Sequence, residues 1–205
     1  TELLGHIIRD FIQKHQLKNL DAVCSHGHTI LHQPENGFTL QIGNLPEIAQ
    51  YCQQTVVCDF RVQDVKLGGQ GAPLVPIGDR LLFADYDYCL NLGGFSNVSF
   101  ETSGGRIAFD ISPVNTVLNF YAHQLGLAYD DRGKIARSGQ LNPMLLKALN
   151  ELEYYQLTYP KSLGIEYVKN TVLPLIEKFE IPTEDKMHTF VQHIAYQTAL
   201  ALPQK

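Results

Sequence analysis

Apolar residues recur at helical spacing near both ends of the chain. Leucine, isoleucine and phenylalanine residues three and four positions apart predict an amphipathic helix over residues 3–12. A similar stripe between Met187 and Leu202 predicts a second helix near the other end. Because both helices are expected to face a core, and Thr1 rather than Met opens the chain, we expect the chain to be a piece of a longer protein.

Strands and helices alternate between these two stripes. Alternating or continuous apolar runs predict strands over residues 21–25, 38–42, 55–60, 88–92, 97–101 and 107–109. The Gly93-Gly94 pair predicts a hairpin, residues 25–29 a polar turn, and residues 66–76 a glycine- and proline-rich connection. The order of these elements predicts an α/β fold in two parts.

Capping residues followed by proline predict where helices begin. Asn44 is expected to cap a helix that runs to about residue 54, and Asn142 is expected to cap another with Pro143 in its first turn. Ser112 with Pro113 predicts a third helix directly after the strand over 107–109. Beyond the helix at Asn142, the chain is expected to be mostly helical.

Composition narrows the classes of partner. The 205 residues include 16 Lys or Arg and 21 Asp or Glu, which gives a formal net charge of −5. Hydrophobic residues at 44% and charged residues at 18% are typical of a globular protein with a core. No run of Lys and Arg offers a surface to nucleic acid or an anionic membrane, so neither is expected as a partner.

The four cysteines form no CxxC pair, so a zinc knuckle is not expected. We expect cysteines in apolar runs, such as Cys24 and Cys58, to behave as small buried hydrophobic residues in a reducing cytoplasm.

Two neighbouring motifs could carry chemistry. In the Gly93-Gly94 turn, the lack of side chains lets backbone N–H groups approach a phosphate, and Ser96 and Asn97 could add side-chain donors. The alternative is an ordinary tight hairpin. Asp110 ends a predicted strand just before a predicted helix, where helix N–H groups would keep it ionised and able to accept a proton. The alternative is a capping role.

A third set of polar residues lies at predicted strand ends and in glycine-rich loops. It could bind a polyhydroxylated ligand through several hydrogen bonds, or it could be solvated loop surface. Its members are Ser25, His26, His28, Thr29, His32, Gln41, Asp59, Arg61, Asp64 and Gln70. The three histidines lack an acidic ligand beside them, so no metal site is expected there.

Taken in order, these motifs resemble the bacterial 1,6-anhydro-N-acetylmuramic acid kinases. The matching stretches are Ser25–Thr29 with His32 and Pro34, Thr39–Asn44, Asp59–Arg61 with Asp64, Gly68–Pro76, Leu90–Ser99, Phe109–Asn115 and Pro160–Glu166. Their shared order and spacing over nearly the whole chain make a stronger signal than any single glycine pair.

The resemblance implies an actin-like ATPase fold with two RNase H-like lobes. Residues 1–86 would be the C-terminal part of the first lobe, and residues 87–205 the N-terminal part of the second, so that the fold is incomplete at both ends. Water would open the anhydro ring of anhydro-N-acetylmuramic acid while ATP, assisted by Mg²⁺, phosphorylates O6. The product, N-acetylmuramic acid 6-phosphate, belongs to cytoplasmic peptidoglycan recycling, and the family implies a homodimer.

The same resemblance implies residue roles. Asp110 would be the catalytic aspartate that deprotonates the attacking water. The phosphate loop would be formed by Gly93, Gly94, Ser96 and Asn97. The sugar would contact His26, Gln41, Asp59 and Arg61.

The chain also departs from the family pattern. The family usually has Gln where His28 stands, and Gly-Pro-Gly where this chain has Ser112-Pro113-Val114. The family's first phosphate loop, Met-Ser-Gly-Thr-Ser-Leu-Asp-Gly, and its later adenosine-binding segment do not occur in this sequence. We therefore expect the chain to be the middle of the enzyme and to be inactive by itself.

Two other functions stay open. One is an actin-like or heat-shock-chaperone-like nucleotide-binding module without sugar kinase activity. The other is a catalytically dead sugar sensor, which the altered Ser112–Val114 stretch would suit.

Overall fold

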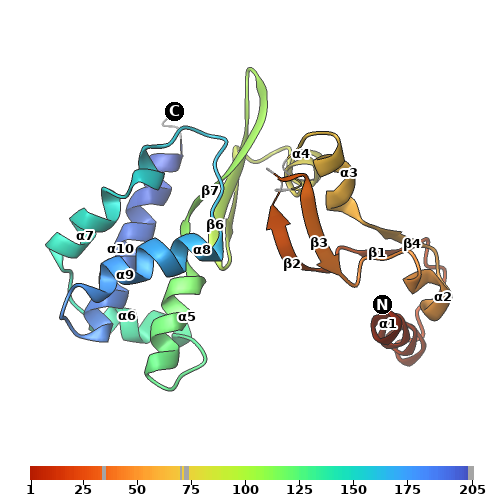
Figure 1. Cartoon of the computed structure of the whole chain (residues 1–205), viewed down its shortest axis with the longest axis horizontal. Coiled ribbons are helices and arrows are strands. Elements are labelled where there is room, and N and C mark those ends of the chain that lie inside the picture. Colours follow the sequence, from red (N-terminus) through yellow and green to blue (C-terminus); the bar gives the residue numbers. More distant parts are fainter. Residues whose placement is uncertain (34–35, 70, 72–73, 203–205) are drawn as a thin grey trace. The chain divides into compact units, whose positions relative to one another are not determined.

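The chain forms two compact units, Thr1–Val75 and Pro76–Lys205. The computed structural model describes residues 1–33, 36–69, 71 and 74–202 (Figure 1). The second unit begins before the boundary expected after residue 86. It includes α4 (Pro76–Leu82), because Asp79 accepts a hydrogen bond from Ser99 and Arg80 pairs with Glu101 at 2.7 Å. The assignment of the two parts to lobes of one larger fold stays a prediction.

The first unit combines a parallel and an antiparallel strand pair with short helices (Figure 1). Its elements are α1 (Glu2–Lys14), β1 (Val23–Ser25), β2 (His28–Gln33), β3 (Phe38–Ile42), α2 (Ile48–Cys52), β4 (Val56–Cys58) and α3 (Phe60–Lys66). β1 and β4 are parallel, with Ser25 opposite Cys58, whereas β2 and β3 are antiparallel. The residues that follow β1 and β4, His26 and Asp59, therefore leave the same end of the parallel pair.

Several predictions for this unit were wrong. The polar turn predicted over residues 25–29 is shorter, because β2 already begins at His28 and pairs with β3. The strand predicted to reach Phe60 ends at Cys58, because Asp59 adopts a left-handed conformation (φ 62°) from which α3 starts. Asn44 does not cap a helix: α2 begins at Ile48 after Glu47, and the Asn44 side chain bonds Asp59 instead.

The second unit has a three-stranded antiparallel sheet in the order β5-β6-β7 followed by helices (Figure 1). The strands are β5 (Tyr88–Leu92), β6 (Phe95–Thr102) and β7 (Gly105–Pro113). The helical part consists of α5 (Asn115–Gln124), η2 (Asp131–Gly133), α6 (Lys134–Ser138), α7 (Pro143–Asn150), η3 (Glu153–Gln156), α8 (Ile165–Tyr167), η4 (Val168–Val172), α9 (Leu173–Glu177) and α10 (Thr183–Ala201). The predicted β5–β6 hairpin, the Asn142 cap and the helical second part are confirmed.

The end of β7 differs from the prediction. Ser112 and Pro113 belong to the strand, and α5 begins at Asn115 with Val114 as its cap. β7 is longer because Ser112 pairs with Ser96 beyond an irregularity in register, and the two hydroxyls lie 3.0 Å apart in the sheet. Ser112 therefore joins β6 to β7 and does not cap the helix.

Two apolar clusters form the core of the second unit. The larger joins α5 to α10 through Val117, Tyr121, Ala136, Leu145, Leu149, Val168, Val172, Ile176, Met187 and Phe190. The smaller lies on one face of the sheet, where Val98, Phe100, Phe109 and Ile111 pack with Ala201 and Leu202 from the end of α10. The sheet is thus held at its apolar face by the helical part of the same unit.

The four cysteines are all free, and all four lie among the described residues. The expectation that cysteines in apolar runs are buried holds only in part. Cys52 is buried, Cys58 and Cys89 are half-buried, and Cys24 is exposed because its side chain lies on the uncovered face of β1. Over the residues that the structure describes, no helix is long and apolar enough to cross a membrane.

Candidate functional site

Asp110 lies within β7, directly opposite Asn97 on β6. Its half-buried carboxylate accepts a hydrogen bond from the Asn97 side chain and another from the Leu163 N–H, with 2.8 Å between Leu163 N and Asp110 Oδ2. Two donors therefore approach this carboxylate from different parts of the unit.

The main chain of Asp110 is held on the other edge of β7. Its N–H donates to the Lys161 carbonyl at 3.1 Å, and its carbonyl accepts a hydrogen bond of 2.5 Å from the Tyr154 hydroxyl. Neither Tyr154 nor Leu163 has a role predicted from the sequence. The one available signal was the Pro160–Glu166 motif, which the structure places beside Asp110.

Burial raises the pKa of Asp110, and the hydrogen bonds from Leu163 and Asn97 oppose this rise. The prediction that N–H groups at a helix start keep Asp110 ionised was wrong. Asp110 lies inside the strand, and the first N–H groups of α5 are already used: Val114 N–H donates to the Gly94 carbonyl at 2.8 Å and Asn115 N–H to the Gly93 carbonyl at 3.3 Å.

Several hydrogen bonds join the Gly93-Gly94 turn to the start of α5. Asn115 Nδ2 donates to the Gly93 carbonyl and Thr116 Oγ1 to the Gly94 carbonyl, both at 2.9 Å. The Gly93 N–H donates to the Phe95 carbonyl at 3.1 Å, and Gly94 is exposed. The turn is therefore held firmly in place and leaves its tip at Gly94 accessible.

The side chains of Ser96 and Asn97, which follow this turn, form hydrogen bonds within the sheet. The Ser96 hydroxyl is fully buried and donates to the Ser112 carbonyl at 3.1 Å, so its side chain is used inside the sheet. The Asn97 side chain bonds Asp110. The structure thus brings the turn and Asp110 into one sheet, with Asn97 as the link between them.

In the first unit, His26 and Arg61 form a pair. Arg61 Nε donates to His26 Nε2 at 2.9 Å, and His26 Nδ1 lies 2.8 Å from the Gly27 carbonyl. This network assigns the ring proton to Nδ1. Arg61 also donates to the Gly71 carbonyl at 2.5 Å, and burial lowers the pKa of its guanidinium. The structure therefore brings His26 and Arg61 into contact, whereas their role in binding the sugar stays a prediction.

Gln41 and Asp59 take part in two separate polar contacts of the same unit. Asn44 Nδ2 donates to Asp59 Oδ1 at 3.0 Å, and Gln41 Nε2 donates to Thr39 Oγ1 at 2.6 Å. Both amides are buried, and within the described part of the chain the carbonyl oxygens of Gln41 and Asn44 have no hydrogen-bond partner. Buried acceptors of this kind normally have a donor, so a ligand hydroxyl could satisfy them. The sequence predicts a capping role for Asn44 and places it at the end of the Thr39–Asn44 motif.

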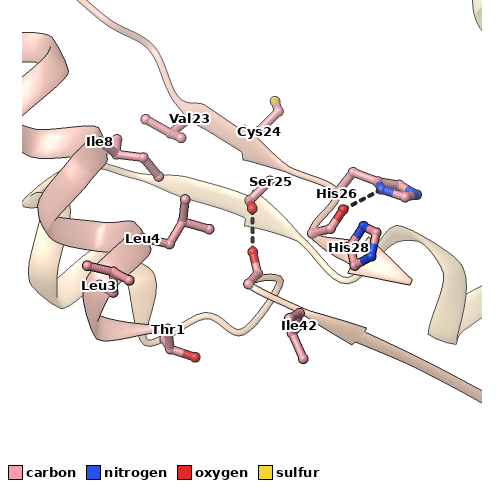
Figure 2. A pocket seen from close by; sticks show the side chains of 12 residues that line it. Thr1, Leu3, Leu4, Ile8, Val23, Cys24, Ser25, His26, His28 and Ile42 are labelled. Atoms are coloured by element: carbon pink, nitrogen blue, oxygen red, sulfur yellow. Dashed lines mark hydrogen bonds between the residues drawn. The ribbon is translucent and has the colours of Figure 1, made fainter. Parts of the chain in front are cut away.

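A hollow on the first unit lies between α1 and the turn after β1 (Figure 2). Its walls include Leu4 and Ile8 of α1 and Val23 and Ile42 of the strands, and Ser25 Oγ donates to the Gly43 carbonyl beside it. Four residues are predicted to contact the sugar: His26, Gln41, Asp59 and Arg61. Among the described residues, His26 is the one of these four that lines this hollow. Its apolar walls suit packing against other side chains better than binding to sugar hydroxyls.

No group of three or more His, Cys, Asp or Glu side chains that could hold a metal ion occurs among the residues that the structure describes. The Pro34 and Gln70 positions of the matching motifs, and the side chain of His32, lie outside the described residues.

Comparisons with known proteins decide the family. The family model for anhydro-N-acetylmuramic acid kinase matches residues 1–201. The chain belongs to this family. The anhydro-N-acetylmuramic acid kinase of Pseudomonas fluorescens (strain Pf0-1) is 42% identical over 185 residues, which is 87% of this chain and 50% of that protein. The kinase of Shewanella loihica (strain ATCC BAA-1088 / PV-4) is 41% identical over 79% of this chain and 45% of its own length.

The resemblance stated from the motifs is therefore confirmed at the level of the family. The chain spans about half the length of the curated relatives it matches. Its mixed α/β character is confirmed, whereas the actin-like arrangement of two lobes and the homodimer stay predictions.

Proposed function

We propose that the protein containing this chain phosphorylates 1,6-anhydro-N-acetylmuramic acid at O6 with ATP, while water opens the anhydro ring to give N-acetylmuramic acid 6-phosphate. Membership of the family and the names of its relatives support the substrate. The observation that carries the proposal is the placement of Asp110: a half-buried carboxylate with a raised pKa, held by two donors next to the glycine turn.

Asp110 acts as the general base. Water that attacks the anomeric carbon must lose a proton, and a carboxylate with a raised pKa is a better proton acceptor than an ordinary aspartate while the pH stays above that pKa. The two donors limit the rise in pKa and orient the carboxylate. Asp110 thus combines a basicity and an orientation that suit this step.

The glycine turn contacts phosphate through its main chain. Gly94 is exposed and Gly93 carries no side chain, so a phosphate can approach the turn closely. Since Ser96 is used by Ser112, Asn97 by Asp110 and the Gly93 N–H by the Phe95 carbonyl, we assign the main-chain contact to the Gly94 N–H. Gly93 contributes because it carries no side chain that would block the phosphate.

ATP would supply the phosphoryl group, and Mg²⁺ would neutralise charge on its phosphates. Mg²⁺ in sites of this kind is bound mainly by nucleotide phosphates and water, with few protein ligands.

The first unit binds the sugar. His26 and Arg61 form one polar pair, and Asp59 accepts a hydrogen bond from Asn44. Among the described residues, the buried side-chain carbonyl oxygens of Gln41 and Asn44 have no hydrogen-bond partner. A sugar hydroxyl donates readily to such oxygens, and the guanidinium of Arg61 suits acceptor atoms of the same ligand.

Replacing the base tests the proposal. In the whole protein, Asp110→Asn keeps the shape of the side chain but removes its basicity, and we expect kcat for sugar phosphorylation to fall by about 100-fold or more. The matched control is Asp10→Asn on exposed α1, which should leave the rate unchanged. The measurement is sugar-dependent ADP release together with mass detection of the phosphorylated sugar.

The outcomes separate the candidate functions. A rate that survives Asp110→Asn would contradict the assignment of the base. ATP hydrolysis without any dependence on the anhydro-sugar would favour the nucleotide-binding module, and the absence of any turnover in the unsubstituted protein would favour the sugar sensor.

A further inference from the structure

Asp110 and Asn97 form the type of strand pair whose side chains lie close together. The main-chain N–H and carbonyl of Asp110 point away from β6, because they bond the Lys161 carbonyl and the Tyr154 hydroxyl. Asn97 and Asp110 are therefore a non-hydrogen-bonded pair of the antiparallel ladder, where opposing side chains approach most closely. This geometry lets the Asn97 amide reach the carboxylate.

Tyr154 is itself held firmly. It is buried, and its ring packs against Tyr155 and Tyr167 with centroids 5.5 and 5.7 Å away. Lys161 Nζ lies 4.6 Å from the centre of the Tyr154 ring and donates to the Tyr154 carbonyl at 3.2 Å. The Tyr154 hydroxyl can thus fix the main chain of Asp110.

We propose that Asn97 and Tyr154 are positioning residues for proton transfer at Asp110: Asn97 orients the carboxylate, and Tyr154 holds the strand that carries it. The Leu163 N–H is a third group that donates a hydrogen bond to Asp110. The inference rests on the proposed function, because it takes Asp110 as the proton acceptor. It adds to that function in two ways: Asn97 orients the Asp110 carboxylate and does not bind phosphate, and Tyr154 holds Asp110 in place.

The titratable side chains on the elements that contact Asp110 include Tyr154 and Lys161. Burial raises the pKa of Tyr154 well above its usual value, and the nearby Asp110 charge adds to this rise. Burial lowers the pKa of Lys161. Tyr154 therefore stays protonated and remains a donor over the pH range in which Asp110 changes its charge.

Two tyrosines on the same element provide a matched comparison. Tyr154→Phe removes the hydroxyl that bonds Asp110, whereas Tyr155→Phe removes a buried hydroxyl of the same element η3 that lies 2.8 Å from His193. In the whole protein, we expect Tyr154→Phe to lower kcat about 10-fold, with KM within about twofold, because substrate binding is untouched while the base is misplaced. Tyr155→Phe should leave kcat within about twofold, as expected for a residue outside the reaction.

The Asn97 amide is tested by the pKa of Asp110 itself. With ¹³Cγ-labelled aspartate in the whole protein, the Asp110 signal is identified by its loss in Asp110→Asn, and its pH titration gives the pKa. Asn97→Leu removes a donor that favours the charged form, so we expect the pKa of Asp110 to rise by about half a unit or more. Asn97→Ala should also raise the pKa of Asp110. Because alanine is smaller than leucine, this variant controls for any disturbance of packing by the leucine side chain.

The readouts separate this inference from the proposed function. Equal effects of Tyr154→Phe and Tyr155→Phe on kcat, in variants of equal melting temperature, would overturn the role of Tyr154. An unchanged Asp110 pKa in both Asn97 variants would overturn the role of Asn97. If Asp110→Asn retains activity while the Asn97 variants shift the pKa, the proposed base is wrong but the orienting contact stands.

Discussion

At the residue scale, Asp110 is governed by two opposing influences. Burial makes the ionised carboxylate less favourable, and the donors on Asn97 and Leu163 recover part of that loss. The net result is a pKa above the usual aspartate value, so the folded protein loses stability as the pH rises through that pKa. The group proposed for catalysis is therefore one that costs folding free energy at neutral pH.

This balance predicts that Asp110→Asn is more stable than the parent protein. An amide keeps an acceptor for the Leu163 N–H but carries no charge to desolvate, so the melting temperature at pH 7 should rise. As the pH falls toward 4, Asp110 becomes protonated in the folded parent, and the difference between the two proteins should shrink. Melting temperatures by differential scanning calorimetry at the two pH values check this, and a variant less stable at pH 7 would contradict it.

At the element scale, a buried polar network ties α7, η3 and α10 together. His193 of α10 is fully buried, with Nδ1 2.6 Å from Asn150 Oδ1 and Nε2 2.8 Å from the Tyr155 hydroxyl. Gln197 Nε2 donates to the same Asn150 oxygen at 2.9 Å. η3 also carries Tyr154, but the hydrogen bonds of this network do not involve Tyr154, so the network stabilises the packing of the helical part of the unit.

The network makes stability depend on pH. Burial lowers the pKa of His193 from 6.5 to about 3. As the pH falls below 6.5, His193 therefore becomes protonated in the unfolded chain but stays neutral in the folded chain, which lowers the free energy of unfolding. From pH 6.5 to pH 5 this should cost about 2 kcal/mol of unfolding free energy. His193→Gln should lose less stability over that range in urea denaturation, whereas His123→Gln, on the exposed end of α5, should behave like the parent. Equal pH dependence in all three proteins would rule out His193 as the cause.

At the scale of the whole molecule, the chain contributes the proposed base, the glycine turn and the residues proposed to bind the sugar. It spans about half the length of the curated relatives it matches. ATP also has an adenosine and further phosphates that need contacts. The family resemblance implies that those contacts lie on segments of the whole protein that this chain does not include.

We therefore predict that the 205-residue chain alone forms no N-acetylmuramic acid 6-phosphate from ATP, Mg²⁺ and the anhydro-sugar. The whole protein should do so under the same conditions, and mass detection of the phosphorylated sugar is the measurement. A circular dichroism melt of the chain serves as the control for folding. Turnover by the chain at a rate close to that of the whole protein would contradict the prediction.

The sequence by itself determined the features that depend on local pattern. Alternating residues predicted β3, and the Gly93-Gly94 pair predicted the β5–β6 hairpin. Asn142 with Pro143 predicted the start of α7, where the Asn142 side chain accepts the Leu145 N–H at 2.9 Å. The ordered motifs also identified the family. These features are readable because the groups that fix them lie within a few residues of one another.

Only the tertiary structure decided what surrounds Asp110. Its carboxylate and carbonyl are bound by Leu163 and Tyr154, which are 53 and 44 positions away. Ser112 likewise joins a strand because Ser96, 16 positions away, bonds it across the sheet. Local signals placed Asp110 and Ser112 at a helix start. Contacts between distant segments outweigh such signals, because a buried polar group must find its partner wherever the fold brings one.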